Sequence, residues 1–285
     1  MKKTILSVLG IGVLFVAAWS LLSCGGDTKN GSVKDEEKSE NPSLNISIFL
    51  DLSDRLVRNM QPNQTYRDTA IVGMVCDYFK TATLGPQILK SENKIKVFFY
   101  PTPSDASIAT VAKGLSVDVG ALKGVERRKA VEGLKSQFQE NLAHIYGQTV
   151  NAKNWVGCDI WDFFSSKKVD AQCVKKDARN ILIILTDGYI FQANNKIKEG
   201  NAYSYILPET LQNPQSSLIA RRTDVPLDNL EVLVLEVNPY QPQHRDKMVQ
   251  VMTDWFQAMG VKNVVISETD ANLDNTETII KNFLN

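Results

Sequence analysis

The chain has 285 residues, of which 43% are hydrophobic and 22% are charged, and its 32 basic residues balance 32 acidic residues. This composition supplies a substantial core and excludes a disordered chain, and the lack of a basic excess gives no indication of nucleic-acid binding. We therefore expect one α/β domain of about 240 residues behind an N-terminal appendage.

The N-terminus has the features of an export signal. Two lysines precede a 20-residue uncharged run, residues 4–23, and Cys24 follows. The last four residues, "LLSC", resemble the bacterial lipobox, in which the cysteine is acylated and becomes the first residue of the mature protein. The run is also long enough to span a bilayer as an uncleaved anchor. We predict a lipoprotein signal peptide over residues 1–24, with fatty acid such as palmitate on Cys24, and a periplasmic or surface-exposed place in the bacterial cell envelope.

Residues 25–44 form the next segment and contain glycine, serine, asparagine and mixed charges, without an aromatic residue. This composition is typical of a flexible polar tether, with a root-mean-square span of ~25 Å. The folded domain, expected over residues 45–285, would therefore stay close to the membrane.

Strand-like and helix-like segments alternate from residue 45 onward. Short apolar runs predict strands buried on both faces, and apolar positions at helical spacing predict helices. Residues 106–112 are expected to pair with the second strand as a hairpin. The alternation predicts a three-layer Rossmann-like α/β fold: an open, mostly parallel sheet with helices on both faces. The expected strands are 46–50, 94–100, 180–188, 230–237 and 261–267, and the expected helices are 66–84, 125–146, 160–164, 245–259 and a last one at the C-terminus.

Two of the predicted strands end in aspartate. Asp51 follows "ISIFL", with Ser53 two residues later, and Asp187 follows "ILIILT". The carboxyl ends of parallel strands converge at one edge of the sheet, where ligands bind. Acidic residues also follow strands simply because they cap the next turn or helix, so a structural role is the alternative. Carboxylate and hydroxyl oxygens suit Mg²⁺ or Mn²⁺, and such a site leaves one position for an acidic side chain of a partner.

Three short motifs together resemble the von Willebrand factor A family. They are "DLSDR" at 51–55, "GCDIWDFF" at 157–164 and "LTDG" at 185–188. That family holds a cation with an Asp-x-Ser-x-Ser motif, a threonine or nearby acid in a middle loop, and an Asp-Gly after the fourth strand. The resemblance implies the same fold over the whole domain, binding of a protein partner, and Asp51, Ser53, Asp159 and Asp187 as metal ligands.

The first two motifs depart from the family pattern. Arg55 replaces the second serine, and a guanidinium cannot ligate a cation. If Arg55 points inward, it pairs with Asp51 and Asp187 and gives a metal-free variant; if it points outward, the cation site survives. Cys158 replaces the threonine and is a soft ligand for a hard ion. Cys158 and Cys173 flank a short helix, and a disulfide between them is the alternative to two free thiols.

Two long connections are expected to rise from the same edge as the site. The first is 113–124. The second, 189–227, is too long for an ordinary connection, and loops of this kind form recognition surfaces or pack as structural insertions. Its candidate partner-binding residues are Tyr189, Tyr203, Tyr205, Arg221 and Arg222.

An enzymatic alternative remains. A phosphatase of the haloacid dehalogenase type would use Asp51 as nucleophile, but that family needs a second aspartate where this chain has Ser53. No Gly-x-Ser-x-Gly or phosphate-binding Gly-x-x-x-x-Gly-Lys motif occurs. We expect a protein-binding domain that is not an enzyme, with the metal-free interaction domain as a further alternative.

Overall fold

A six-stranded sheet forms the centre of the domain, in the order β3-β2-β1-β4-β7-β8. The computed structural model describes residues 42–153, 155–189, 198–199, 202–203, 226–240 and 242–285. Neighbouring strands are parallel except β2 and β3, which are antiparallel. The strands are β1 Ser43–Leu50, β2 Lys94–Phe98, β3 Ser116–Asp118, β4 Ala178–Leu185, β7 Leu230–Val237 and β8 Asn263–Glu268, and a separate hairpin joins β5 Lys198–Glu199 to β6 Ala202–Tyr203.

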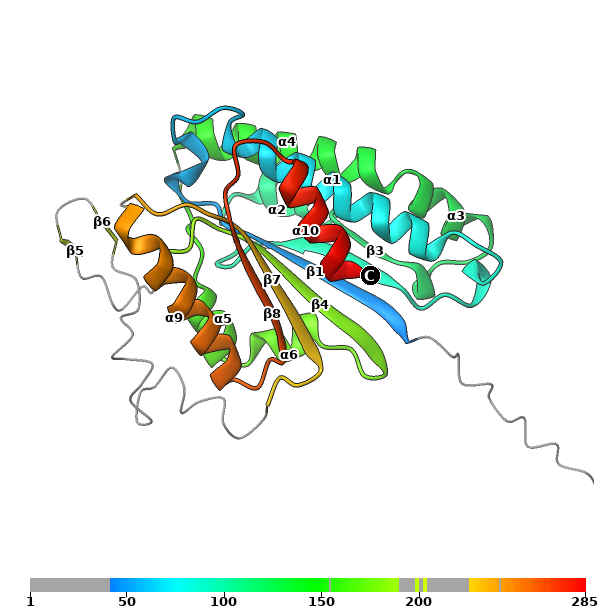
Figure 1. Cartoon of the computed structure of the whole chain (residues 1–285). Coiled ribbons are helices and arrows are strands. Elements are labelled where there is room, and N and C mark those ends of the chain that lie inside the picture. The colour runs from blue at the N-terminus through cyan, green and yellow to red at the C-terminus, as the bar shows by residue number, and fades with distance from the viewer. Residues whose placement is uncertain (1–41, 154, 190–197, 200–201, 204–225, 241) are drawn as a thin grey trace, which may run out of the picture. The chain divides into compact units, whose positions relative to one another are not determined.

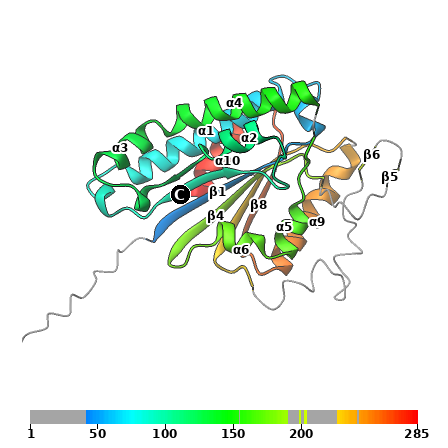
Figure 2. The same ribbon diagram turned by 180° about the vertical axis from the view of Figure 1, so that it is seen from behind.

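Helices cover both faces of the sheet, which gives three layers (Figures 1 and 2). One face carries α1, α4 and α10, and the other carries α5, α6 and α9. This confirms the predicted Rossmann-like α/β fold. The helices are α1 Gln64–Thr83, α2 Ala106–Ala112, α3 Val125–Glu132, α4 Leu134–Ala152, α5 Ile160–Ser165, α6 Lys168–Cys173, α9 Arg245–Ala258 and α10 Asp274–Leu284, with 3₁₀ turns η1 Asp54–Val57, η2 Ile88–Lys90, η3 Val119–Ala121 and η4 Pro242–His244.

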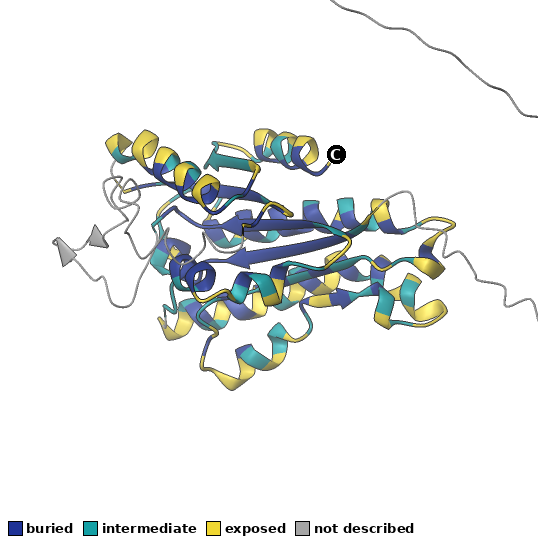
Figure 3. Ribbon diagram, turned by 90° about the horizontal axis from the view of Figure 1, so that it is seen from below, coloured by how far each residue is buried: buried dark blue, intermediate teal, exposed yellow. Residues whose placement is uncertain are grey.

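The central strands are buried on both faces because their side chains alternate between two cores. In β1, Ile46, Ile48 and Leu50 pack with α1, α4 and α10, whereas Phe49 packs with α5 and α9. Figure 3 shows the buried sheet between helices whose outer faces are exposed. Each fully buried side chain of this size contributes about 1.5–3 kcal/mol relative to exposure. This burial holds the ends of β1 and β4 in place as a rigid support for the residues that follow.

Three local predictions need correction. Residues 106–112 form helix α2, because the Asp105 side chain caps it by accepting hydrogen bonds from Ser107 and Ile108; the predicted hairpin is wrong. The single helix predicted over 125–146 is two helices that meet at Gly133, a poor helix former. The first strand begins at Ser43, inside the segment assigned to the tether.

The connection 113–124 does not rise toward the site. It contains β3, the antiparallel partner of β2, with Asp118 opposite Lys94 at the amino end of β2. The segment therefore runs to the edge of the sheet that lies opposite the site. Among the described residues, no helix is both long and apolar enough to cross a membrane.

Candidate functional site

The candidate site lies where the order of the strands reverses. Counted along the chain, the six strands of the sheet follow the order 3-2-1-4-5-6, so β1 and β4 are neighbours whose connections leave in opposite directions. Ligands of open α/β sheets bind at this switch point, beyond the carboxyl ends of the strands. Asp51 follows β1 there, and its N–H donates to Leu185 O at 3.0 Å. The structure thus brings Asp51 and the end of β4 together, as predicted.

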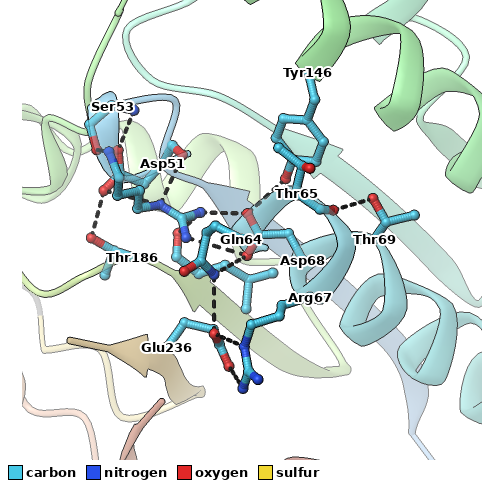
Figure 4. A network of polar contacts seen from close by, with 12 residues as sticks. Asp51, Ser53, Gln64, Thr65, Arg67, Asp68, Thr69, Tyr146, Thr186 and Glu236 are labelled. Carbon is cyan, nitrogen blue, oxygen red and sulfur yellow. Dashed lines mark hydrogen bonds and ion pairs between the residues drawn. The ribbon is translucent and has the colours of Figure 1, made fainter. Parts of the chain in front are cut away.

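The Asp51 carboxylate is 1% exposed and already satisfied (Figure 4). Its Oδ1 accepts the Ser53 N–H at 2.8 Å, and its Oδ2 accepts the Thr186 hydroxyl at 2.8 Å. Ser53 caps η1 through its Oγ, which accepts the Arg55 N–H at 3.4 Å. The loop after β1 is therefore folded tightly around its own aspartate.

Arg55 points inward and is 1% exposed. Its Nε donates to Asp51 O at 3.1 Å and lies 3.6 Å from Asp51 Oδ2. Its two terminal nitrogens donate to Asp68 of α1, Nη2 to Oδ2 at 2.7 Å and Nη1 to Oδ1 at 3.3 Å. Nη2 also donates to Leu185 O at 3.1 Å. Of the two expected arrangements, the structure has the inward one, with Asp68 rather than Asp187 as the second carboxylate.

A buried network extends from this ion pair into α1, α4 and β7. Gln64 Nε2 donates to Asp68 Oδ1 at 2.9 Å and to Glu236 Oε2 at 3.1 Å. Arg67 completes a two-bond pair with Glu236, Nε to Oε2 at 2.6 Å and Nη2 to Oε1 at 2.9 Å. The Tyr146 hydroxyl of α4 donates to Asp68 Oδ2 at 2.9 Å. Figure 4 shows these side chains converging on the end of the sheet from three elements.

Sequence reasoning missed this network, although a signal was present. Arg67 and Asp68 lie one helical turn before Ile71 and Val72, on the face of α1 that turns toward the sheet. Charged residues on a buried helix face need partners, because unpaired buried charge is costly. Glu236 gives the same signal in β7, where it interrupts an apolar strand and has a φ of 70°.

The electrostatics of the network favour a permanently charged Arg55. Burial alone lowers the pKa of Arg55, but the attraction of Asp68 and Asp51 outweighs burial and raises the pKa above its usual value. Burial, together with the nearby Asp68 charge, raises the pKa of Tyr146 and keeps its hydroxyl a neutral donor.

Asp187 lies nearer the surface and has a different arginine partner. It is 6% exposed, and its Oδ2 lies 3.5 Å from Arg58 Nη2. Burial, reinforced by the negative charge of Asp51, raises the pKa of Asp187 to about 7. Arg58 also donates to Asn238 O, and its guanidinium lies 3.5 Å from the centre of the Tyr240 ring. Tyr240 covers this arginine and is itself 52% exposed.

The middle loop lies beside β1, as predicted, but its residues have structural roles. Gly157 and Leu52 form a β-bridge. Asp159 caps α5 by accepting the Asp162 N–H at 2.9 Å. Cys158 is 1% exposed, and burial raises the pKa of its thiol well above its usual value. Cys158 and Cys173 are free thiols.

Of the candidate partner-binding residues, Tyr189 lies at the site. Its hydroxyl accepts the Tyr240 N–H at 3.0 Å, and the two rings are 5.6 Å apart between centroids. Tyr203 belongs to β6, the second strand of the separate hairpin. Tyr205, Arg221 and Arg222 lie outside the described residues.

The site as arranged does not fit a divalent cation. The carboxylates of Asp51 and Asp187 each have a guanidinium within 4 Å, and these positive charges would repel a cation at the same place. Within the described ranges, no group of three histidine, cysteine or acidic side chains is placed to hold a metal ion. Binding of Mg²⁺ or Mn²⁺ by Asp51, Ser53, Asp159 and Asp187 stays a prediction, and the geometry favours the metal-free alternative.

Several solved structures align with this chain at low sequence identity. No protein-family model and no curated protein matches the chain. The conserved hypothetical protein BatB from Bacteroides thetaiotaomicron aligns at 11% identity and a TM-score of 0.40, over 85% of this chain and 97% of that one. An aerotolerance-related membrane protein from Bacteroides fragilis NCTC 9343 aligns at 9% identity and a TM-score of 0.40, over 85% and 98%. The pilus adhesin SpaC from Lactobacillus rhamnosus GG aligns at 12% identity and a TM-score of 0.44, over 86% of this chain but 30% of the adhesin.

Proposed function

We propose that this protein is a lipid-anchored component of a bacterial cell envelope whose von Willebrand A-like domain binds a protein partner at the carboxyl edge of its sheet without a metal ion. Arg55 takes the place of the cation and holds β1, β4 and α1 together through Asp51, Leu185 and Asp68. The surface above that core, formed by Arg58, Tyr189 and Tyr240, contacts the partner.

One observation carries the interaction role. Arg58 is stacked under a half-exposed Tyr240 at the mouth of the site, and Val57 beside it is also 52% exposed. Arginine and tyrosine are enriched among the residues that dominate protein–protein binding energies, because they combine apolar contact area with directed hydrogen bonds. The acidic partner side chain expected earlier belongs to the metal-bound alternative, since it would complete the coordination of a cation.

The geometry gives no support to the phosphatase alternative. A nucleophilic aspartate must reach the substrate, whereas Asp51 is 1% exposed and both of its carboxylate oxygens accept hydrogen bonds. Ser53 occupies the position that would hold the general acid.

Site-specific photo-cross-linking in cells that express the full chain tests the interaction surface. A photoreactive amino acid at Tyr240 is expected to give discrete protein adducts. The same amino acid at Glu140, an exposed residue of α4 away from the site, is the matched control and is expected to give none. Adducts of equal pattern and yield at both positions would contradict the proposal.

Metabolic labelling with palmitate tests the anchor independently. The full chain is expected to incorporate the label and to fractionate with membranes. Cys24→Ser removes the acylated thiol and should abolish the label, because serine has no sulfur atom with which a thioether to the lipid could form. Equal labelling of both chains would show that Cys24 is not the lipidated residue.

A further inference from the structure

The amino end of the sheet is where the tether joins the domain. β1 begins at Ser43, and the Leu44 N–H donates to Asn93 Oδ1 at 2.8 Å. Asn93 lies three residues after Lys90, the last residue of η2. In Figures 1 and 2, α3 and the start of β1 lie at this same end of the sheet. The entry point of the tether is thus fixed beside η2.

A single arginine, Arg127, connects the loops around that entry point through hydrogen bonds. Arg127 of α3 donates to five backbone carbonyl groups and so holds η2 against the loop before α3. Two large apolar side chains project from the joined segments, Leu89 at 67% exposure and Val125 at 73%. The carbonyl acceptors are Leu122 at 2.8 Å, Ile88 at 3.0 Å, Leu89 at 2.6 Å, Ser91 at 3.2 Å and Gly120 at 3.3 Å.

An excess of positive charge surrounds these apolar side chains. Lys90, Lys123 and Lys129 are exposed, and within the described part of the chain no carboxylate lies at ion-pair distance from them. Of the acids nearby, Asp118 pairs with Lys94 at 3.3 Å and Glu92 pairs with Lys175 at 3.4 Å, whereas Glu126 is exposed beside Val125. Between residues 118 and 129 the chain has four basic and two acidic residues.

We propose that this amino-edge surface, consisting of Leu89, Lys90, Lys123, Val125 and Lys129, rests on an anionic lipid bilayer. The inference rests on the lipid anchor proposed above. From Cys24 to Ser43 the chain is short enough, with a root-mean-square span of ~25 Å, to keep this edge at the membrane. Lysines then meet lipid phosphates while Leu89 and Val125 enter the headgroup region.

The contact would orient the site. β1 has eight residues, which at about 3.3 Å per residue span ~26 Å. Asp51 and the surface around Tyr240 therefore face away from the bilayer, toward a partner.

Vesicle co-sedimentation tests the contact without the anchor. The protein is residues 40–285, a compact unit that contains the whole described fold and lacks Cys24. It should bind phosphatidylcholine vesicles that contain ~30% phosphatidylglycerol and bind pure phosphatidylcholine vesicles at least several-fold more weakly. Lys90→Asp with Lys123→Asp should lower the partition coefficient on anionic vesicles roughly 30-fold, since each basic residue contributes about one kcal/mol at such a surface.

The matched control reverses two exposed lysines at the opposite edge. Lys153→Asp with Lys247→Asp changes the net charge equally and should bind as the unchanged protein does. Leu89→Ser with Val125→Ser, which keeps the charge, should weaken binding several-fold through loss of apolar contact. Absence of binding to anionic vesicles, or equal losses in the two charge-reversal variants, would overturn the proposal. Neither result depends on acylation of Cys24 or on a partner at Tyr240, so failure here is distinguishable from failure of the proposed function.

Discussion

The two edges of the sheet use charge in opposite ways. At the carboxyl edge, Arg55, Asp51 and Asp68 are each at most 1% exposed and compensate one another inside the domain. At the amino edge, Lys90 and Lys123 are exposed and have no acidic partner in the described part of the chain. Charge that is paired and buried specifies structure, whereas free surface charge is available to an outside partner. In the proposed function, recognition at the carboxyl edge therefore depends on the half-exposed Tyr240 rather than on the buried acids.

We expect the largest effect on stability from substitution of the buried Arg55. Arg55→Ala leaves Asp51 and Asp68 without their counter-charge, so we expect the free energy of unfolding of residues 40–285 to fall by about 3–5 kcal/mol, measured by urea denaturation. Arg128→Ala removes an exposed pair with Glu132 at 3.4 Å and should cost less than ~0.5 kcal/mol. A loss below ~1 kcal/mol in Arg55→Ala would mean that the network does not hold this edge together.

A double substitution sharpens that result. Arg55→Met with Asp68→Leu replaces the pair by apolar side chains of similar size and should be less destabilising than Arg55→Ala, because one buried carboxylate, Asp51, loses its counter-charge instead of two. A double variant that is less stable than the single one would show that the polar contacts themselves, rather than charge compensation, dominate.

Asp187 should make stability depend on pH. Its pKa is raised to about 7 when folded, so the folded state holds the proton more tightly than the unfolded state. The contribution of Asp187 to the free energy of unfolding is fully present below about pH 4, which is the pKa of an aspartate in the unfolded chain. This contribution is lost as the pH rises to about 7. Asp187→Asn removes the cost of burying an ionised carboxylate. The variant should therefore be more stable than the unchanged protein at pH 8, by on the order of 2–4 kcal/mol. The difference should vanish near pH 4; urea titrations at both pH values check this, and a constant difference would contradict the raised pKa.

Substitution of one glycine at each edge of the sheet should give a smaller difference in stability. Gly188, directly after Asp187, has a φ of 96°, and an added Cβ would clash with Met248 Sδ. Gly85 at the amino edge has open space around the same position. Gly188→Ala is expected to destabilise by about 1–3 kcal/mol, and Gly85→Ala by less than ~0.5 kcal/mol. Thermal denaturation of both variants distinguishes them, and equal melting temperatures would contradict the tight turn at the site.

The sequence predicted the parts of the fold that depend on local pattern. The apolar runs of β1, β4 and β7 and the helical spacing of α1 and α9 identified the layers, because burial on two faces leaves a continuous hydrophobic signal. The α2 region was misread because its apolar residues suit a strand as well as a short helix. The side chain of Asp105 caps this segment and stabilises the helix.

The site was predicted in position but only partly in composition. The convergence of Asp51 and Asp187 follows from parallel topology alone. The partners of Arg55 do not, because Asp68 and Leu185 lie 13 and 130 residues away along the chain. Which of several acids pairs with a buried arginine depends on the docking of α1 on the sheet, and no local pattern encodes that. Arg58 and Tyr240 likewise meet only because η1 and the end of β7 share one edge.

Calorimetric titration of Mn²⁺ into residues 40–285 tests the central claim, that Arg55 occupies the place of a cation, most directly. An Asp51→Ala, Asp187→Ala double variant provides the reference. We predict that millimolar Mn²⁺ gives no saturable heat with either protein, because each carboxylate already has a guanidinium beside it. Saturable binding that disappears in the double variant would contradict the account and establish a metal site at the carboxyl edge.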